Sequence, residues 1–139
     1  MDQTEQTSKY PNLSKKWQTR FEFFDKHGVK RTPEYKKALD EMNLLDSEVI
    51  RFNWIAFFFG VIYFFILGLW RKGLIILIGA GILNGLIITV VETMRGNPLI
   101  AIVLNFVLAF ATASVYALTA NRAYYLHKVK GSESANPFE

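Results

Sequence analysis

Side chains that could do chemistry are few in this 139-residue sequence, and they are far apart. A catalytic nucleophile needs a base beside it, and a metal ion needs several His, Cys, Asp or Glu ligands at close spacing. His27 and His127 are a hundred residues apart, Ser114 has no base near it in sequence, and there is no cysteine. We therefore expect no catalytic residues, no metal site and no cofactor, and we expect that the protein is not an enzyme.

Two asparagines, Asn84 and Asn105, lie inside long apolar stretches. An amide in apolar surroundings needs a hydrogen-bond partner, so such residues either join helices or line a polar path for a solute. No Asp, Glu, Lys, Arg or His accompanies them inside these stretches. Joining two helices is therefore the favoured interpretation. A polar path that also includes Thr112 and Tyr116 stays open as the alternative.

The elements that hold these asparagines are indicated by the distribution of charge. Residues 1–51 carry 19 of the 28 formally charged side chains. The segments 52–70, 73–91 and 98–120 carry none, and they contain 19, 19 and 23 residues. A helix rises about 1.5 Å per residue and a bilayer core is about 30 Å thick, so each segment has the length of a membrane segment. The sequence thus predicts an all-α integral membrane protein with a membrane domain at 52–130.

The first segment, 52–70, can be arranged in two ways, and the flanking basic residues discriminate between them. If all three segments cross the membrane, four basic residues lie on one side and five on the other. If the first segment is re-entrant, with a bend near Gly60, eight basic residues share one face and only Arg95 lies opposite. Basic residues gather on the cytoplasmic side. We therefore favour a re-entrant segment followed by a two-helix transmembrane hairpin, with the N-terminus and C-terminus cytoplasmic. The spanning arrangement stays open.

The short connection 92–97 predicts that the second and third segments pack as an antiparallel hairpin. Positions at equal depth then have residue numbers that sum to about 189, and Asn84 and Asn105 meet this condition. A hydrogen bond between such amides contributes about 0.6–2 kcal/mol in a membrane. Small residues beside this pair would allow close approach. The predicted helix–helix contact residues are Gly81, Asn84, Gly85, Ala101, Asn105 and Ala109.

Residues 14–51 are predicted to form an amphipathic helical module in the cytoplasm, between disordered tails at 1–13 and 131–139. Ser14 and Gly28 bound its first helix, Thr32-Pro33 starts the second, and Asp46 or Ser47 caps a third helix that continues into the first apolar segment. The first helix carries large aromatics on one face, which lie at an anionic lipid surface or pack on the second helix. Trp54 and Trp70 suit a membrane interface. The predicted membrane-surface residues are Trp17, Phe21, Phe24, Trp54 and Trp70.

The aromatic stretch Arg51-Phe-Asn-Trp-Ile-Ala-Phe-Phe-Phe-Gly60, followed by Tyr63 and by Trp70-Arg-Lys-Gly73, resembles the DUF2628 family of small bacterial membrane proteins. The family pattern usually has proline after this glycine, where Val61 stands here. The resemblance covers about residues 14–95. It implies a bacterial inner-membrane location and carries no assigned activity or catalytic residues.

The function that follows from the sequence is a non-catalytic role in the inner (plasma) membrane, exercised through protein or lipid interaction. The expected partners are membrane lipid and another membrane protein or a second copy of the chain. The near balance of charge in the N-terminal region argues against nucleic acid as a partner. The alternative is a small transporter, channel or transporter subunit that works as an oligomer, because two or three helices do not enclose a pore.

Overall fold

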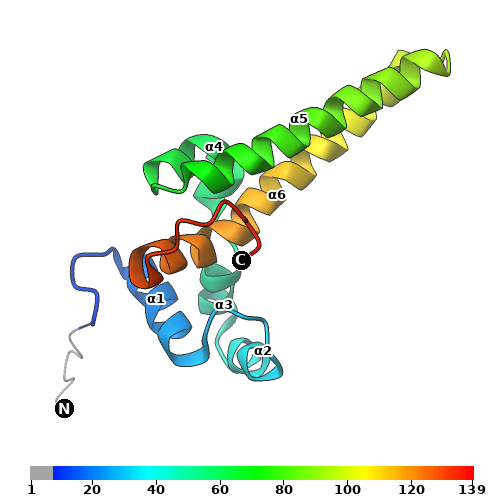
Figure 1. Ribbon diagram of the computed structural model, residues 1–139. Coiled ribbons are helices and arrows are strands. Elements are labelled where there is room, and N and C mark those ends of the chain that lie inside the picture. The colour runs from blue at the N-terminus through cyan, green and yellow to red at the C-terminus, as the bar shows by residue number, and fades with distance from the viewer. Residues whose placement is uncertain (1–7) are drawn as a thin grey trace. The chain divides into compact units, whose positions relative to one another are not determined.

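The computed structural model describes residues 8–139, which form six helices and no strand. The chain divides into two compact units, residues 1–52 and 53–139. The first unit contains the three short helices and the second contains the apolar ones (Figure 1). The helices are α1 Lys15–His27, α2 Pro33–Asp40, α3 Leu44–Arg51, α4 Trp54–Ile66, α5 Trp70–Thr93 and α6 Pro98–Lys130.

Helix α1 begins and ends, and helix α2 begins, at the residues that local rules predict. Ser14 precedes α1, and Gly28, with a φ of 74°, ends it by donating its N–H to the Phe24 carbonyl. The Thr32 hydroxyl accepts a hydrogen bond from the Tyr35 N–H, and Pro33 takes the first helical position of α2. These bounds confirm the predicted first and second helices, because caps act within a few residues of chain.

Helix α3 departs from the prediction at both ends. Asn43, rather than Asp46 or Ser47, caps it, since the Asn43 side-chain oxygen Oδ1 accepts from the Asp46 N–H at 2.8 Å. The helix then stops at Arg51 and does not run into the apolar segment. Phe52 is extended, and Asn53 caps a new helix, α4, by accepting from the Ala56 N–H. Asparagine is among the strongest N-cap residues, so Asn43 and Asn53 each start a new helix here.

The first unit is organised around aromatic rings on α1. Phe23 packs edge-on against Tyr35 of α2, with ring centroids 5.1 Å apart. Arg20 Nε donates to the Val49 carbonyl of α3 at 2.8 Å. Tyr10 contacts the ring of Phe21 at 5.1 Å. Residues 8–13, predicted as part of a disordered tail, therefore pack on α1, because an aromatic ring in a polar tail finds an apolar face. Residues 1–7 of that predicted tail lie outside the described residues.

In the second unit, α5 and α6 form a long antiparallel hairpin (Figure 1). The Tyr116 hydroxyl donates to the Gly73 carbonyl at 2.8 Å, and the Asn84 amide donates to the Asn105 side-chain carbonyl. Both pairs of residue numbers sum to 189, so one register holds along the hairpin. By length and composition alone, three helical stretches of the described chain are apolar enough to cross a membrane: Leu44–Ile66, Trp70–Thr93 and Pro98–Lys130.

Helix α4 enters beside α6 and is then broken. The Asn53 N–H donates to the Ala117 carbonyl at 3.0 Å, which places the start of α4 on the C-terminal half of α6. The ring of Phe57 reaches Phe110, with centroids 5.5 Å apart. Gly60 follows, with a φ of 44° and a ψ of −120°, outside the helical region. Glycine adopts this conformation without the steric cost of a Cβ, so the bend falls where Gly60 stands.

After Gly60 the chain returns toward the end of α6 from which α4 started. Phe64 packs edge-on against Tyr116, with ring centroids 5.0 Å apart. A Cβ at Gly68 would lie 3.2 Å from Nε2 of His127, near the end of α6. Each half of α4 is therefore too short to cross a bilayer core of about 30 Å, and both ends of the segment lie at the same end of α6.

Candidate functional site

The two asparagines of the predicted helix contact lie side by side. Asn84 donates its amide hydrogen to Asn105, and Asn105 in turn donates to the Ala101 carbonyl at 2.8 Å. The Thr112 hydroxyl donates to the Leu108 carbonyl of its own helix. The polar groups that could line a solute path thus hydrogen-bond to the hairpin itself. This geometry supports the role of a helix contact.

The small residues of the predicted contact do not lie where close packing was expected. An added Cβ at Gly81 or Gly85 would meet nothing within 4 Å, so neither glycine brings α5 and α6 together. Ala109 is exposed and lines an apolar groove with Phe57 and Phe106. The glycine on which α5 is closely packed is Gly73, where a Cβ would lie 2.9 Å from Phe64 Cβ. The prediction chose the wrong glycines because sequence spacing does not show which face of a helix is covered.

The predicted membrane-surface residues differ in their exposure to solvent. Trp54 and Trp70 are about half exposed at the two ends of the first apolar segment, as an interface requires. Phe21 and Phe24 are buried, which corrects their prediction as surface residues. Trp17 is half-buried, with the Arg20 guanidinium 4.4 Å from its ring centroid.

Within residues 8–52, the large apolar side chains that are exposed are two leucines that were not predicted from the sequence. Leu44 is 88% exposed and Leu45 is 77% exposed, at the first turn of α3. Their signal was the capping residue Asn43, which fixes the start of the helix and leaves the pair on its first turn.

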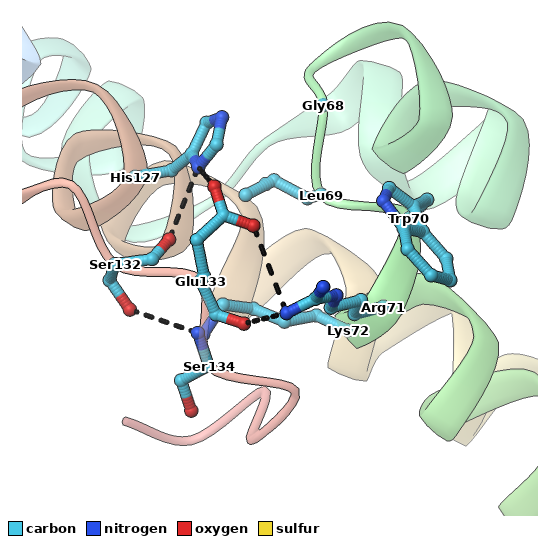
Figure 2. Close-up of a pocket in the computed structure, with 9 residues that line it drawn as sticks. All are labelled: Gly68, Leu69, Trp70, Arg71, Lys72, His127, Ser132, Glu133 and Ser134. Carbon is cyan, nitrogen blue, oxygen red and sulfur yellow. Dashed lines mark hydrogen bonds and ion pairs between the residues drawn. The ribbon is translucent and has the colours of Figure 1, made fainter.

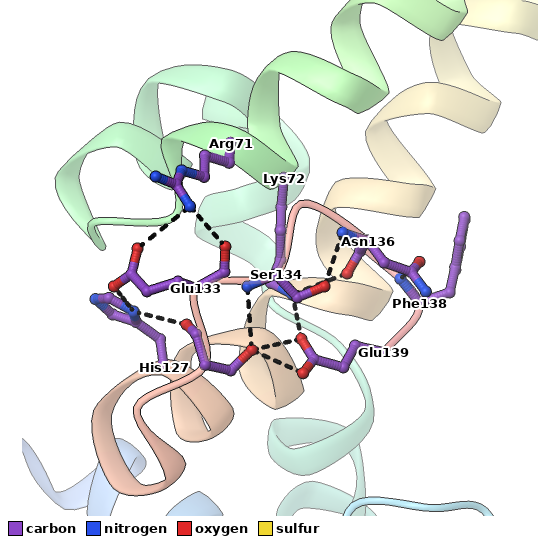
Figure 3. Close-up of polar contacts among 9 residues, drawn as sticks. Arg71, Lys72, His127, Glu133, Ser134, Asn136, Phe138 and Glu139 are labelled. Atoms are coloured by element: carbon purple, nitrogen blue, oxygen red, sulfur yellow. Dashed lines mark hydrogen bonds and ion pairs between the residues drawn. The ribbon is translucent and has the colours of Figure 1, made fainter.

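A polar cluster at the base of the hairpin, where α5 begins and α6 ends, was also not predicted. We call it the base cluster. Figure 2 shows the side around Arg71, His127 and Glu133, and Figure 3 adds Asn136 and Glu139. It joins the first turn of α5 to the segment after α6, which was predicted to be a disordered tail. The residues of the base cluster are Arg71, Lys72, His127, Ser132, Glu133, Ser134, Asn136 and Glu139.

Lys72 is the centre of the base cluster. Its side chain is 2% exposed, and its ammonium donates to Glu139 at 2.7 Å and to the Asn136 carbonyl at 2.8 Å (Figure 3). Ser132 donates to the same Glu139 carboxylate at 2.7 Å. The hydrogen bond from Lys72 is the largest cause that holds the pKa of Glu139 below its usual value. A buried charge needs such partners, so this contact fixes residues 131–139 against the base.

Arg71 and His127 share a second carboxylate more loosely. Arg71 donates to the Glu133 backbone carbonyl at 3.1 Å, and its guanidinium lies 3.9 Å from the Glu133 carboxylate (Figure 2). His127 Nδ1 lies 3.6 Å from the other Glu133 oxygen and 3.1 Å from the Ser132 carbonyl. Over residues 8–139, no group of three or more His, Cys, Asp or Glu side chains is placed to hold a metal ion. The arrangement is thus one of cations matched to carboxylates.

The family pattern described as "Protein of unknown function (DUF2628)" matches residues 3–130. The chain belongs to this family. The uncharacterized protein YigF of Escherichia coli K12 is 37% identical over 124 residues, which cover 86% of this chain and 88% of YigF. YigF of Salmonella typhimurium LT2 is 35% identical over the same lengths. No solved structure matches the chain.

The DUF2628 match extends past the aromatic stretch that carried the resemblance and includes all three apolar segments. The two buried polar side chains of that stretch are Asn53 and Lys72. The Asn53 side chain is buried, and its amide donates to the Asn121 side-chain oxygen Oδ1 at 2.8 Å, which ties the start of α4 to α6. Lys72, from the basic turn of the stretch, is the buried cation of the base cluster. Both partners are more than sixty residues away in sequence, so no local rule identifies them.

Proposed function

We propose that this DUF2628 member is an integral inner-membrane protein in which α5 and α6 cross the bilayer and α4 is re-entrant. The observation that carries the proposal is the return of the α4 segment to its starting end of α6. This return puts Arg71 and Lys72 at the end of the hairpin that also carries the basic residues of α6, Arg122, Lys128 and Lys130. Arg95 lies at the opposite end. Such asymmetry supports a cytoplasmic position for the base cluster.

The dimensions of the hairpin support this placement. The 24 residues of α5 correspond to about 36 Å of helix, and a bilayer core is about 30 Å thick. The 33 residues of α6 correspond to about 50 Å, so its last turns extend beyond the core into the cytoplasm. Large apolar side chains are exposed along both helices, among them Ile78, Ile82, Val103 and Phe106. Lipid tails are the solvent that suits such a surface.

The role we propose is non-catalytic and works through binding. The membrane domain anchors the helical module, residues 14–51, at the cytoplasmic face, and the module presents Leu44 and Leu45 to a membrane component. Covering these two largely exposed leucines with protein or lipid removes apolar surface from water, which favours binding.

A photo-crosslinking amino acid at Leu45 tests this role in intact cells. We expect one discrete adduct, either to a membrane protein or to lipid. The matched control carries the same probe at Lys36, a residue of α2 that is exposed and polar. Equal, diffuse labelling from both positions would contradict the role of the leucine pair.

A further inference from the structure

We propose that the base cluster is a binding site for an anionic phosphodiester headgroup, and that the chain's own Glu133 and Glu139 occupy it in this structure. The inference deepens the proposed function, on which it rests for the position of the cluster at the membrane surface. It assigns to Arg71, Lys72 and His127 a ligand class rather than a purely structural role.

Lys72 is buried at the centre of the base cluster. An ammonium group that is 2% exposed needs a counter-charge, because its desolvation costs several kcal/mol. Glu139 supplies this charge from 67 residues away, in a segment whose other contacts here are mostly polar. A carboxylate oxygen and a phosphate oxygen are alike as acceptors for a lysine ammonium. The site that receives Glu139 therefore has the chemistry of an anion site.

Further hydrogen-bond donors converge on the site around Lys72. Arg71 is adjacent to Lys72, and His127 faces them from the last turns of α6 (Figure 2). The N-terminus of α5 lies there as well, and no side chain caps it. Helix N-termini favour negative charge, and a guanidinium matches two oxygens of a phosphate. This helix end adds to a site that the buried Lys72 already defines.

The carboxylates of Glu133 and Glu139 are bound with unequal strength. Glu139 accepts hydrogen bonds of 2.7 Å, whereas Glu133 lies 3.6 Å from His127 and 3.9 Å from Arg71 and is 65% exposed. Exposed ion pairs at such distances contribute little. The void between the tail and the cations is about 10 Å³, room for one water. A headgroup can therefore enter only when the tail moves away, and the Glu133 contacts are the weaker barrier.

The position of the cluster favours lipid as the source of the phosphate. Trp70 precedes the two cations and is about half exposed, with the Arg71 guanidinium 5.3 Å from its ring centroid. Tryptophan is enriched at the level of lipid headgroups. An acyl chain attached to a headgroup at this level can lie along the exposed apolar surface of α5. A soluble phosphate would use only the polar half of this arrangement.

The test uses the full chain in dodecyl maltoside with an environment-sensitive fluorophore on Ala135→Cys, an exposed tail position in a chain without other cysteines. The probes are dioctanoyl phosphatidylglycerol, dioctanoyl phosphatidylcholine and inorganic phosphate. We expect phosphatidylglycerol to shift the emission and phosphatidylcholine to leave it unchanged. A full shift with inorganic phosphate alone would support the anion site and assign its source to soluble phosphate.

Substitutions distinguish binding at the base cluster from non-specific attraction by positive charge. Glu133→Gln should tighten phosphatidylglycerol binding about threefold, because a competing carboxylate is lost. Lys72→Gln should weaken it about tenfold. Lys128→Gln removes the same charge from the same end, outside the cluster, and should change binding less than about twofold. Arg71→Gln, at a half-exposed position, gives a second site variant should Lys72→Gln fail to fold.

Equal binding by the Lys72→Gln, Arg71→Gln and Lys128→Gln variants would overturn the site, as would equal shifts with both lipids. These readouts are made in detergent and do not depend on which segments cross the membrane. A failed headgroup site and a failed membrane topology are therefore distinguishable, because topology is read from the loop between α5 and α6.

Discussion

The Tyr116 hydroxyl donates a 2.8 Å hydrogen bond to the Gly73 carbonyl, and this contact joins the start of α5 to the middle of α6. The same tyrosine ring lies against the bend at Gly60, where a Cβ would approach it to 3.3 Å, and packs edge-on against Phe64. Tyr116 thus lies against the bend of α4, its second half and the first turn of α5. It is one of the side chains that hold the returning segment against the hairpin.

Tyr116→Phe keeps the ring and removes the hydrogen bond. We expect a loss of about 1 kcal/mol in the free energy of unfolding, because the Gly73 carbonyl stays buried without this donor. Unfolding by SDS titration in mixed micelles measures this loss. Ser114→Ala is the control, since that hydroxyl bonds only to the Phe110 carbonyl of its own helix. An equal effect of both substitutions would contradict the special role of Tyr116.

Gly73→Ala and Gly81→Ala form a matched pair on one helix. A Cβ at residue 73 would overlap Phe64, so we expect destabilisation of about 1–3 kcal/mol. A Cβ at residue 81 meets nothing within 4 Å, and alanine favours a helix by up to about 1 kcal/mol. The same SDS titration should therefore show opposite signs. If Gly81→Ala is destabilising in native membranes, a second helix covers that face.

Asn84 and Asn105 should be energetically coupled. A double-mutant cycle with alanine at each position is expected to give a coupling free energy of about 0.6 to 1.7 kcal/mol, the range for interhelical hydrogen bonds in membranes. Asn84 with Thr112 is a control pair, because the Thr112 hydroxyl bonds within α6. A coupling near zero for Asn84 and Asn105 would show that the two amides find other partners.

Attachment of the tail should weaken in acid. The hydrogen bond from Lys72 lowers the pKa of Glu139, so its stabilising effect is full above the ordinary carboxyl pKa and is lost as the pH falls through the lowered value. The fluorophore at Ala135→Cys should report tail release below about pH 4.5. In Glu139→Gln this transition should be absent. A transition of unchanged size in Glu139→Gln would assign the release to another group.

Local and periodic rules predicted much of this fold. The caps at Thr32 and Gly28 act over a few residues, and the hairpin register follows from a short loop, so Asn84 and Asn105 could be paired from sequence. The bend at Gly60 was indicated by charge counting together with the lone glycine in an aromatic run. These features need only neighbours in the chain or a single repeated spacing.

The base cluster needed contacts that no spacing encodes. Lys72 is buried because a tail of small polar residues folds back over it, and such a composition ordinarily indicates disorder. Gly73 and Gly81 look alike in sequence, yet only Gly73 faces Phe64. In the same way, Phe21 is buried because Tyr10, in a segment of polar composition, covers part of it. Each of these depends on the tertiary arrangement.

The sidedness of Trp70 tests the account most directly. Single cysteines at Lys36, Trp70 and Met94, in a chain that has no other, would be labelled with a membrane-impermeant maleimide in intact and in lysed spheroplasts. A re-entrant α4 predicts that the first two positions react only after lysis and that Met94 reacts in both samples. Labelling at Trp70 in intact spheroplasts, with Met94 protected, would show that the first segment crosses the membrane and would contradict the account.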